Sequence, residues 1–504
     1  MTSDQVAPGI VLGIDVGTSG LKAVLLDAGG KVVDEATSEY SIRVPQAGWA
    51  EQDPDTWWQA LCGALRTLWD RGHDSAAVAV IGLTGQMHSL VLLDRDGSVL
   101  APSILWCDQR TATECDEITR RVGEVDLLRL VANPALPGFT APKILWVRKH
   151  WPTALSRAAH LMLPKDFIRY RLTGTVATDA SDASGTLLFD VRRRSWSDDL
   201  VRELEIDRNL LPRVFEGPEI TGHVSHTAAG QLGLVAGTPV VAGGSDNAAA
   251  AVGLGAVDPG VLTLSIGTSG VLFAPLDRFP DVVDGRLHVF CHALPDRWHL
   301  MSVTLAAGAS LHWLRDALEP LLPEAGDAAY EWLTARAAKA PAGSADLLFL
   351  PYLTGERTPI ADPMARGVFY GLHMGHRVEH LIRAVLEGVA FSQRQGLDLM
   401  REAGAATSVA RGAGGGLTSA LWRQVLADAL GVGLQLAPFG TGAARGAAVL
   451  GGLGIGIFDS PAVGMEWDDL PVQAPDPEGS AALERPYGVY QALYPALRPV
   501  FRAP

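Results

Sequence analysis

Two short glycine-containing loops recur about half a chain apart and constrain the fold more than any other feature. The sequence DVGTSG occupies residues 15–20, and SIGTSG occupies residues 265–270 of the 504-residue chain. Runs of Val, Leu and Ile lead into and out of each loop, as expected for two strands joined by a tight turn. The repeat therefore predicts one strand–turn–strand unit in each half of the chain.

The two loops have the composition of phosphate-binding turns. Glycine permits positive φ and leaves backbone N–H groups accessible to an anion, while Thr and Ser hydroxyls add donors. The alternative is a pair of ordinary hairpins whose glycines only form corners. Asp15 distinguishes the first copy, because Ser265 takes its place in the second. A carboxylate beside phosphates needs a cation such as Mg²⁺ between them, so the first copy is predicted to serve a metal–nucleotide complex.

The charge and motif content of the chain exclude several classes of partner and site. The net charge of −15 argues against nucleic acid and against an anionic membrane surface, because both need a basic face. No GxxxxGK[ST] sequence occurs, which excludes a P-loop. With 504 residues and 48% hydrophobic content, the chain is expected to form two to three globular domains.

The location of the protein is predicted from its targeting signals and cysteines. Residues 1–5 (MTSDQ) lack the basic flank and apolar core of a signal peptide, and the longest uncharged apolar run, residues 446–458, is too short to span a bilayer. The four cysteines include no CxxC pair. We therefore expect a cytoplasmic protein whose thiols are reduced packing residues.

Apolar segments rich in Val and Ile alternate with helical patterns along the chain, which indicates an α/β fold. Asp53 and Pro54 are predicted to begin a helix, as N-cap and first helical residue. The glycine-rich run at residues 243–245 places the domain boundary near residue 245, with domains 1–245 and 246–504. Two α/β lobes that each begin with such a hairpin would place both turns at a central cleft, the pattern of actin-like ATPases.

Asp246 is the strongest candidate for a general base. It follows an apolar strand, where an α/β sheet presents functional side chains to a crevice. Phosphoryl transfer needs a carboxylate within hydrogen-bonding reach of the attacking hydroxyl. Asn247 has an amide that can bind neighbouring hydroxyls. The alternative is that residues 246–247 form an Asx turn capping a helix that starts at Ala248, and both roles are compatible.

Three further segments carry polar or glycine-rich patterns that decide nothing alone. Residues 85–88 (GQMH) end a strand, and residues 106–110 (WCDQR) suit either a polyol site or a buried ion pair. Residues 412–416 (GAGGG) leave room for a base or ribose, or form only a flexible loop, before Ser419, an expected helix N-cap. His373, His376 and His380 lack the cysteines or carboxylates that would complete a metal site, so we interpret them as a solvated helix entry.

Taken together, these segments resemble the FGGY family of carbohydrate kinases. The resemblance runs from Ile10 to about Phe501. It is carried by two long signatures, at residues 138–150 and at residues 367–372 with 380–387, and by shorter stretches at residues 51–54, 57–58, 85–88, 163–166, 290–295 and 355–359. Leu417 and Thr418 depart from the Ala-Arg that commonly follows the glycine run, and Ser245 stands where glycine is frequent.

The resemblance implies two ribonuclease-H-like lobes, with the sugar deep in the cleft and ATP nearer its mouth. It implies that Asp246 is the general base and that Asp15 positions Mg²⁺ through water. The implied sugar contacts are Met87, His88, Asp246 and Asn247. The implied nucleotide contacts are Thr18 and Ser19 at the terminal phosphate, Gly267 and Thr268 at the other phosphates, and Gly414, Gly415 and Gly416 at the adenosine.

The activity implied is ATP- and Mg²⁺-dependent phosphorylation of D-xylulose at its 5-hydroxyl. An FGGY kinase for another pentulose or pentitol, such as ribulose, arabinitol or xylitol, is the first alternative, because sugar choice depends on a few hydroxyl contacts. A non-catalytic sugar-sensing or actin-like protein is the second. The implied partners are a small sugar and ATP, and a homodimer is expected from the resemblance.

Overall fold

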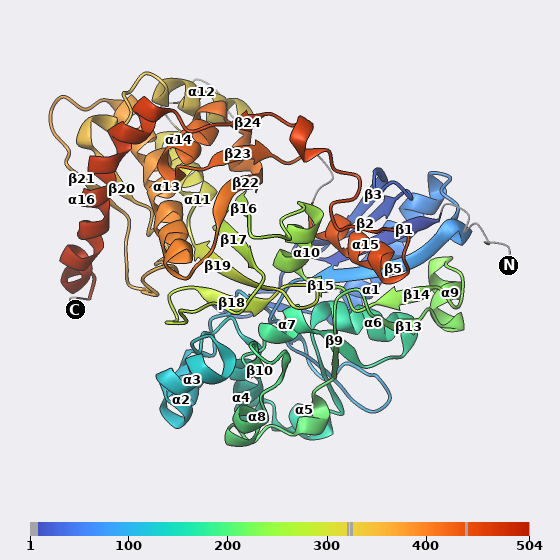
Figure 1. The fold of residues 1–504 in the computed structure, drawn as a ribbon. Coiled ribbons are helices and arrows are strands. Elements are labelled where there is room, and N and C mark those ends of the chain that lie inside the picture. The colour runs from blue at the N-terminus through green and yellow to red at the C-terminus, as the bar shows by residue number, and fades with distance from the viewer. Residues whose placement is uncertain (1–8, 320–321, 323–325, 439–441, 503–504) are drawn as a thin grey trace.

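The computed structural model describes residues 9–319, 322, 326–438 and 442–502, and residues 1–5, used above for the targeting prediction, lie outside this range. Strands and helices form two lobes, each built on its own sheet (Figure 1). This confirms the predicted α/β class.

The first sheet has the strand order β13-β14-β5-β1-β2-β3, and β15 pairs with β5 beside this path. The strands are β1 Ile10–Val16, β2 Gly20–Leu26, β3 Val32–Glu39, β5 Val78–Gly85, β13 Ile220–His223, β14 Pro239–Val241 and β15 Gly244–Ser245. The second sheet has the order β18-β19-β17-β16-β22-β23-β24. Its strands are β16 Gly260–Ile266, β17 Gly270–Leu276, β18 His288–Cys291, β19 Trp298–Thr304, β22 Thr407–Ala413, β23 Gly433–Leu436 and β24 Val472–Gln473.

The two sheets repeat one arrangement. β1 pairs antiparallel with β2 and parallel with β5, and β16 pairs antiparallel with β17 and parallel with β22. The predicted strand–turn–strand units are therefore confirmed at both loops. The positive φ expected of their glycines was wrong, since neither Gly17 nor Gly267 has one. Lack of space explains why residue 17 is a glycine, because a Cβ there would lie 2.8 Å from the Gly20 carbonyl oxygen.

Between β5 and β14 the chain forms a region of short helices and two-stranded ribbons, which lies below the first sheet in Figure 1. Its helices are α2 Ala112–Val122, α3 Glu124–Val131, α4 Thr140–His150, α5 Pro152–Arg157, α6 Pro164–Thr173, α7 Ala180–Ser184, α8 Asp198–Glu203 and α9 His226–Leu232. Its ribbons include β6 Val91–Leu93 with β8 His160–Met162, β9 Ala177–Asp179 with β12 Arg213–Phe215, and β10 Phe189–Asp190 with β11 Ser195–Trp196. A further pair joins β4 Glu51–Gln52 to β7 Ser103–Ile104.

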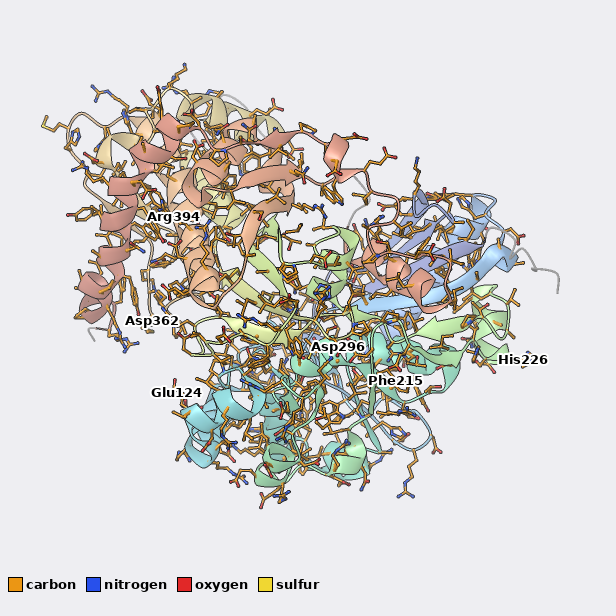
Figure 2. The ribbon with its side chains drawn as sticks, viewed as in Figure 1. Glu124, Phe215, His226, Asp296, Asp362 and Arg394 are labelled. Carbon is orange, nitrogen blue, oxygen red and sulfur yellow. The ribbon has the colours of Figure 1, made fainter. Side chains whose placement is uncertain are left out.

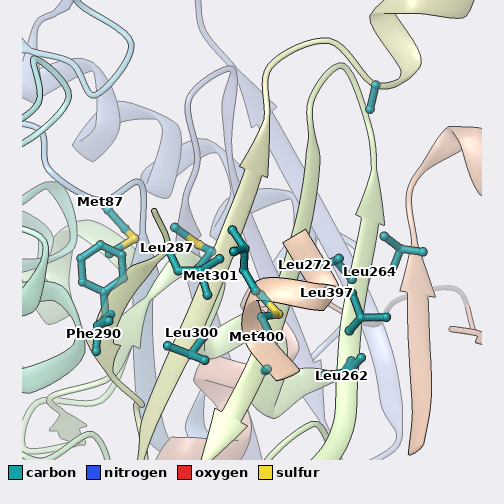
Figure 3. Close-up of a cluster of buried hydrophobic side chains, with 14 of the residues drawn as sticks. Met87, Leu262, Leu264, Leu272, Leu287, Phe290, Leu300, Met301, Leu397 and Met400 are labelled. Atoms are coloured by element: carbon teal, nitrogen blue, oxygen red, sulfur yellow. The ribbon is translucent and has the colours of Figure 1, made fainter. Parts of the chain in front are cut away.

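Long helices cover the second sheet. They are α11 Gly308–Leu318, α12 Asp327–Ala337, α13 Val378–Glu402, α14 Ala420–Leu430 and α16 Pro477–Phe501, with a ribbon of β20 Leu348–Leu350 and β21 Val368–Tyr370. The buried face of α13 packs into a hydrophobic cluster that also contains Leu272 and Leu300 from the sheet (Figure 3). The same cluster extends beyond the second lobe to Met87, whereas the first sheet and the helix after Asp53 pack in a separate cluster.

The expected helix after Asp53 is confirmed as α1 Pro54–Asp70, with Asp53 at its N-cap accepting a hydrogen bond from Asp55 N. Its apolar residues at helical spacing form the buried face against the first sheet, and include Trp57, Leu61, Leu65 and Leu68. Among the residues that the structure describes, we find no helix with the length and apolar character needed to cross a bilayer.

Two helices lie between the sheets, α10 Asp246–Gly253 and α15 Ala443–Gly454 (Figure 1). They cross at glycines. A Cβ on Gly446 would lie 1.7 Å from the Ala249 carbonyl oxygen, and one on Gly253 would lie 2.2 Å from the Gly442 carbonyl oxygen. α15 comes from the C-terminal half of the chain but packs on β1 and β5 of the first sheet. The two helices therefore connect the lobes, with the backbone of one in direct contact with the backbone of the other.

This crossing predicts a stability difference between two glycine-to-alanine variants. Gly446→Ala places a methyl group against backbone and should lower the free energy of unfolding by about 1–3 kcal/mol. Gly488→Ala is the matched control, because Gly488 is exposed in α16 and a Cβ there meets nothing within 4 Å. It should be neutral or stabilising by about 0.5–1 kcal/mol. Urea denaturation compares them, and equal midpoints would contradict the close crossing.

Candidate active site

Three neighbouring strands of the first sheet bring the predicted sugar and metal residues together. β1 and β15 both pair parallel with β5, where Asp15 and Gly244 are each opposite Thr84. The carboxyl ends of parallel strands meet at one edge of a sheet, where α/β proteins place their ligands. Asp15, residues 86–88 and residues 246–247 therefore converge, although they are far apart in the sequence.

Gly243 makes this approach possible. Its φ is +75°, a conformation that favours glycine, and a Cβ there would lie 1.8 Å from the Leu83 carbonyl oxygen. The chain can thus pass close to β5 and deliver Asp246 beside residues 86–88. The predicted helix start at Ala248 was wrong by two residues, because the chain turns from β15 directly into α10 with Ser245 at the N-cap.

Asp246 is partly buried at the first position of α10. Its Oδ1 accepts hydrogen bonds from the Asn247 backbone N–H at 2.7 Å and the Asn247 side-chain Nδ2 at 2.9 Å. Burial raises the pKa of Asp246 to about 6, while the two bonds from Asn247 act in the opposite direction. A carboxylate with this pKa is mostly ionised at neutral pH and still basic enough to accept a proton.

Asp15 is the second carboxylate of this edge. Burial and the nearby charge of Asp246 raise its pKa to about 7, although Lys22 acts in the opposite direction. Its Oδ1 is buried and has no hydrogen-bond partner among the described residues. A buried carboxylate oxygen without a partner is costly unless a cation compensates it. Asp15 therefore has the chemistry expected of a group that faces a divalent cation.

His88 has a defined tautomer. Its Nδ1 lies 2.6 Å from the Gly185 carbonyl oxygen, which can only accept, so Nδ1 donates. Burial, with Lys143 nearby, lowers the pKa of His88 to about 3, and the ring is therefore neutral. Nε2 is left as a hydrogen-bond acceptor. Met87 is buried beside it, with Sδ 3.8 Å from Asn247 Nδ2. In Figure 3 the Met87 side chain lies against the Phe290 ring.

The first family signature, residues 138–150, holds His88 in place, which the sequence pattern did not reveal. His88 has an unusual φ of +67°. Its carbonyl oxygen accepts hydrogen bonds from Thr140 Oγ1 at 3.0 Å and from Lys143 Nζ at 2.9 Å, and Lys143 also donates to the Gly138 carbonyl oxygen at 2.7 Å. Two donors on one carbonyl fix the strained turn after β5.

The first glycine loop is held by polar side chains that sequence reasoning also missed. Gln52 Nε2 donates to the Thr18 carbonyl oxygen at 2.7 Å, and Tyr40 Oη donates to the Gly17 carbonyl oxygen at 2.6 Å. Trp106 Nε1 donates to Thr18 Oγ1 at 2.9 Å. The loop carbonyls of Gly17 and Thr18 are therefore bonded within the protein, and the Thr18 hydroxyl is held between Trp106 and Gln86. Ser19 is exposed at the tip of this loop.

A cavity of about 1030 Å³ lies beside the second glycine loop. Four predicted nucleotide residues line it, namely Gly267, Thr268, Gly415 and Gly416. Gly414 precedes them with φ +105°, and a Cβ there would lie 2.6 Å from the Ile266 carbonyl oxygen. The cavity is large enough for a nucleotide-sized ligand. Thr18 and Ser19 do not line it, because they belong to the other lobe.

Helices α11 and α12 supply much of the remaining lining, which no sequence motif indicated. Gly308 begins α11 directly against the second loop, where a Cβ would lie 2.3 Å from the Gly267 carbonyl oxygen. The departure at residues 417–418 also has a structural explanation: Leu417 is buried in the core, and Thr418 Oγ1 donates to the Gly415 carbonyl oxygen at 2.8 Å. Ser419 is confirmed as the N-cap of α14.

The buried ion pair, rather than a polyol site, explains the charged residues at 106–110. Arg110 binds Asp108 at 2.6 Å and Glu51 at 2.9 Å, with all three side chains buried, and it lies over the Trp49 ring.

The histidine run leads into α13, as expected. Both ring nitrogens of His376 are already bonded, Nδ1 to His373 N and Nε2 to the Ala345 carbonyl oxygen. Across the described residues, no group of three or more His, Cys, Asp or Glu side chains is arranged to hold a metal ion.

Comparison with known proteins agrees with this arrangement. Residues 10–253 match the N-terminal domain of the FGGY family of carbohydrate kinases, and residues 262–455 match its C-terminal domain. The chain is 41% identical to a xylulose kinase of Escherichia coli K12, over 97% of this chain and 99% of the relative. It is 38% identical to a xylulose kinase of Bacillus subtilis 168, over 89% of both chains.

Solved structures give the same result. A xyloylose kinase from Brucella ovis superposes with a TM-score of 0.91 at 37% identity, covering 97% of this chain and 100% of that one. A xylulose kinase from Rhodospirillum rubrum superposes with a TM-score of 0.90 at 31% identity, covering 98% and 100%. The chain therefore belongs to the FGGY family of carbohydrate kinases and is an ATP-dependent sugar kinase.

Proposed function

We propose that this kinase transfers the terminal phosphoryl group of ATP to the 5-hydroxyl of D-xylulose, with Asp246 as general base. The observation that carries the proposal is the convergence of Asp246, Asn247, Met87 and His88 at one edge of the first sheet. The similarity to xylulose kinases over nearly the whole chain supports the choice of sugar.

In this proposal the sugar hydroxyls donate to groups that can only accept. His88 Nε2 and the Asp246 carboxylate are acceptors, and Asn247 contributes an amide oxygen. Asp246 accepts the proton of the attacking hydroxyl as the oxygen–phosphorus bond forms, and ADP leaves with the electrons of the broken bond. Met87 and the neighbouring aromatic rings exclude water, which would otherwise compete for the phosphoryl group.

Residues of both loops hold the nucleotide in the proposal. Thr18 and Ser19 face the terminal phosphate, Gly267 and Thr268 face the other phosphates, and the adenosine lies in the cavity at residues 414–416. Asp15 positions Mg²⁺, whose charge would offset that of the phosphates; the unpartnered buried Oδ1 supports this assignment. The chain division near residue 245, where β15 ends and α10 begins, belongs to the same proposal. The homodimer and the cytoplasmic location stay predictions.

A sugar panel tests the substrate. D-xylulose, D-ribulose, D-arabinitol and xylitol are compared in an assay of ADP release, because sugar choice depends on a few hydroxyl contacts. We expect the highest kcat/KM for D-xylulose and a product phosphorylated at O5. A higher value for another sugar would replace D-xylulose in the proposal. ADP release that is independent of sugar would favour the actin-like ATPase alternative.

Replacing the proposed base gives the second test. Asp246→Asn keeps the shape of the side chain but cannot accept the proton, so kcat should fall about 10²- to 10⁴-fold while ATP binding is retained. Asp277→Asn, at an exposed position, is the matched control and should keep full activity. Near-normal turnover by Asp246→Asn would remove Asp246 from the role of base.

The pH profile gives the third test. Because the base must be unprotonated and its pKa is raised to about 6, kcat/KM should fall as the pH drops through about 6. Asn247→Ala removes the Nδ2 donor that stabilises the carboxylate, so the acid limb should move to higher pH. An acid limb that stays at the same pH in Asn247→Ala would show that another group titrates.

A further inference from the structure

The loop at residues 355–359, between β20 and β21, presents an arginine to the sugar end of the site from the second lobe. Arg357 is partly buried, and within the described chain its guanidinium has no hydrogen bond or ion pair. Only its backbone is fixed, because Arg357 N donates to Glu356 Oε1 at 2.8 Å. A guanidinium withdrawn from bulk solvent without an acceptor carries an uncompensated cost, which a bound ligand can remove.

The position of the guanidinium places it near the elements that hold His88. Arg357 Nη2 is 3.8 Å from the point where a Cβ on Gly138 would stand. The carbonyl oxygen of Gly138 binds Lys143, which also binds the carbonyl oxygen of His88. The charge of Arg357 contributes to the lowered pKa of both His88 and His288, so it acts on this side of the site.

The loop that carries Arg357 is rigidly attached to the second sheet. Thr358 N donates to the Val303 carbonyl oxygen, and Val303 N donates to Thr358 Oγ1, both at 3.1 Å. Glu356 Oε1 accepts a further bond from Leu305 N at 2.9 Å. The backbones of Glu356 and Asp362 form an antiparallel β-bridge. In Figure 2, Asp362 is labelled at the end of the second lobe that faces the helices around Glu124. Arg357 thus extends from a fixed support in one lobe toward the other lobe.

Apart from Arg357, the side chains named around His88 offer few hydrogen-bond donors that are free to bind a sugar oxygen. Nε2 of His88 and the Asp246 carboxylate accept, Lys143 Nζ is buried and bonded to two carbonyls, and Trp106 Nε1 is bonded to Thr18. A ketose has one oxygen, its carbonyl, that can only accept a hydrogen bond. A guanidinium carries five N–H donors and no acceptor, which is the complementary chemistry.

We propose that Arg357 binds the sugar from the second lobe, donating hydrogen bonds to substrate oxygens that include the ketone. This inference rests on the proposed function, because it needs a ketose in the site. It assigns to the second lobe a direct contact with a substrate whose other contacts, Met87, His88, Asp246 and Asn247, belong to the sheet edge of the first lobe and the start of α10.

The test compares Arg357→Gln and Arg357→Lys with the control Arg366→Gln. Arg366 is exposed in the same segment and, among the residues described, donates only to the Pro363 and Ala365 carbonyl oxygens. Since hydrogen bonds to charged groups are worth a factor of about 10–150 in affinity, Arg357→Gln should raise the sugar Kd and KM about 10- to 100-fold. Arg357→Lys should recover only part of the loss, because it lacks the planar fork. The KM for ATP and the melting temperature should not change.

Sugar binding is measured by calorimetry without ATP, using the sugar that the wild-type enzyme phosphorylates best. A wild-type Kd in Arg357→Gln overturns the inference. So does equal loss of sugar and ATP binding with a lower melting temperature, which would indicate a structural role. Because the titration uses the sugar selected by the panel, a failure of D-xylulose as substrate and a failure of Arg357 as sugar ligand are separate results.

Discussion

The close crossing of α10 and α15 is the contact on which the rest of the structure depends. Gly446 and Gly253 allow two helix backbones to touch, and on the opposite side of α15 a Cβ on Gly82 would lie 1.7 Å from the Ala447 carbonyl oxygen. Glycine costs about 0.5–1 kcal/mol in a helix interior relative to alanine, so these positions carry a cost that the packing offsets. Arg445, buried in the same helix, donates to the Gly253 carbonyl oxygen at 2.8 Å and also to that of Val463. Backbone contacts therefore bring the two helices together, and the long side chain of Arg445 adds hydrogen bonds to them.

The chemistry of the site follows from the edge of the first sheet. β1, β5 and β15 end side by side, and each continues into a polar segment. Burial, with a smaller effect of the Asp246 charge, raises the pKa of Asp15 to about 7, and burial raises the pKa of Asp246 to about 6. A carboxylate oxygen of Asp15 without a partner among the described residues and the Asp246 carboxylate lie at this edge. The cavity of the second lobe is lined by glycine backbone, hydroxyls and aromatic rings, and also by the acidic residues Asp316, Asp327 and Glu331.

The sequence predicted those features that depend on local pattern. The twin hairpins, the helix after Asp53, the N-cap Ser419 and the class of fold are confirmed, because strand–turn periodicity and capping residues act over a few positions. Features that depend on distant contacts were missed. Lys143 holds the His88 carbonyl from a helix 55 residues away in sequence, and α11 lines the cavity through a glycine contact that no motif encodes. The positive φ expected of the loop glycines was wrong for a related reason: the space around Gly17 is set by Gly20, and its φ is ordinary.

Asp246 is the first residue of α10, and the other end of this eight-residue helix lies in the crossing with α15. A helix of that length is about 12 Å long, so turning it by about 10° about its far end at Gly253 would move Asp246 by about 2 Å. A misplacement of 1 Å is enough to slow an enzymatic reaction about 100-fold. α10 is therefore held at its glycine contacts and carries the proposed base at its first residue. The packing that sets the angle of α10 at this crossing therefore also sets the position of the proposed base.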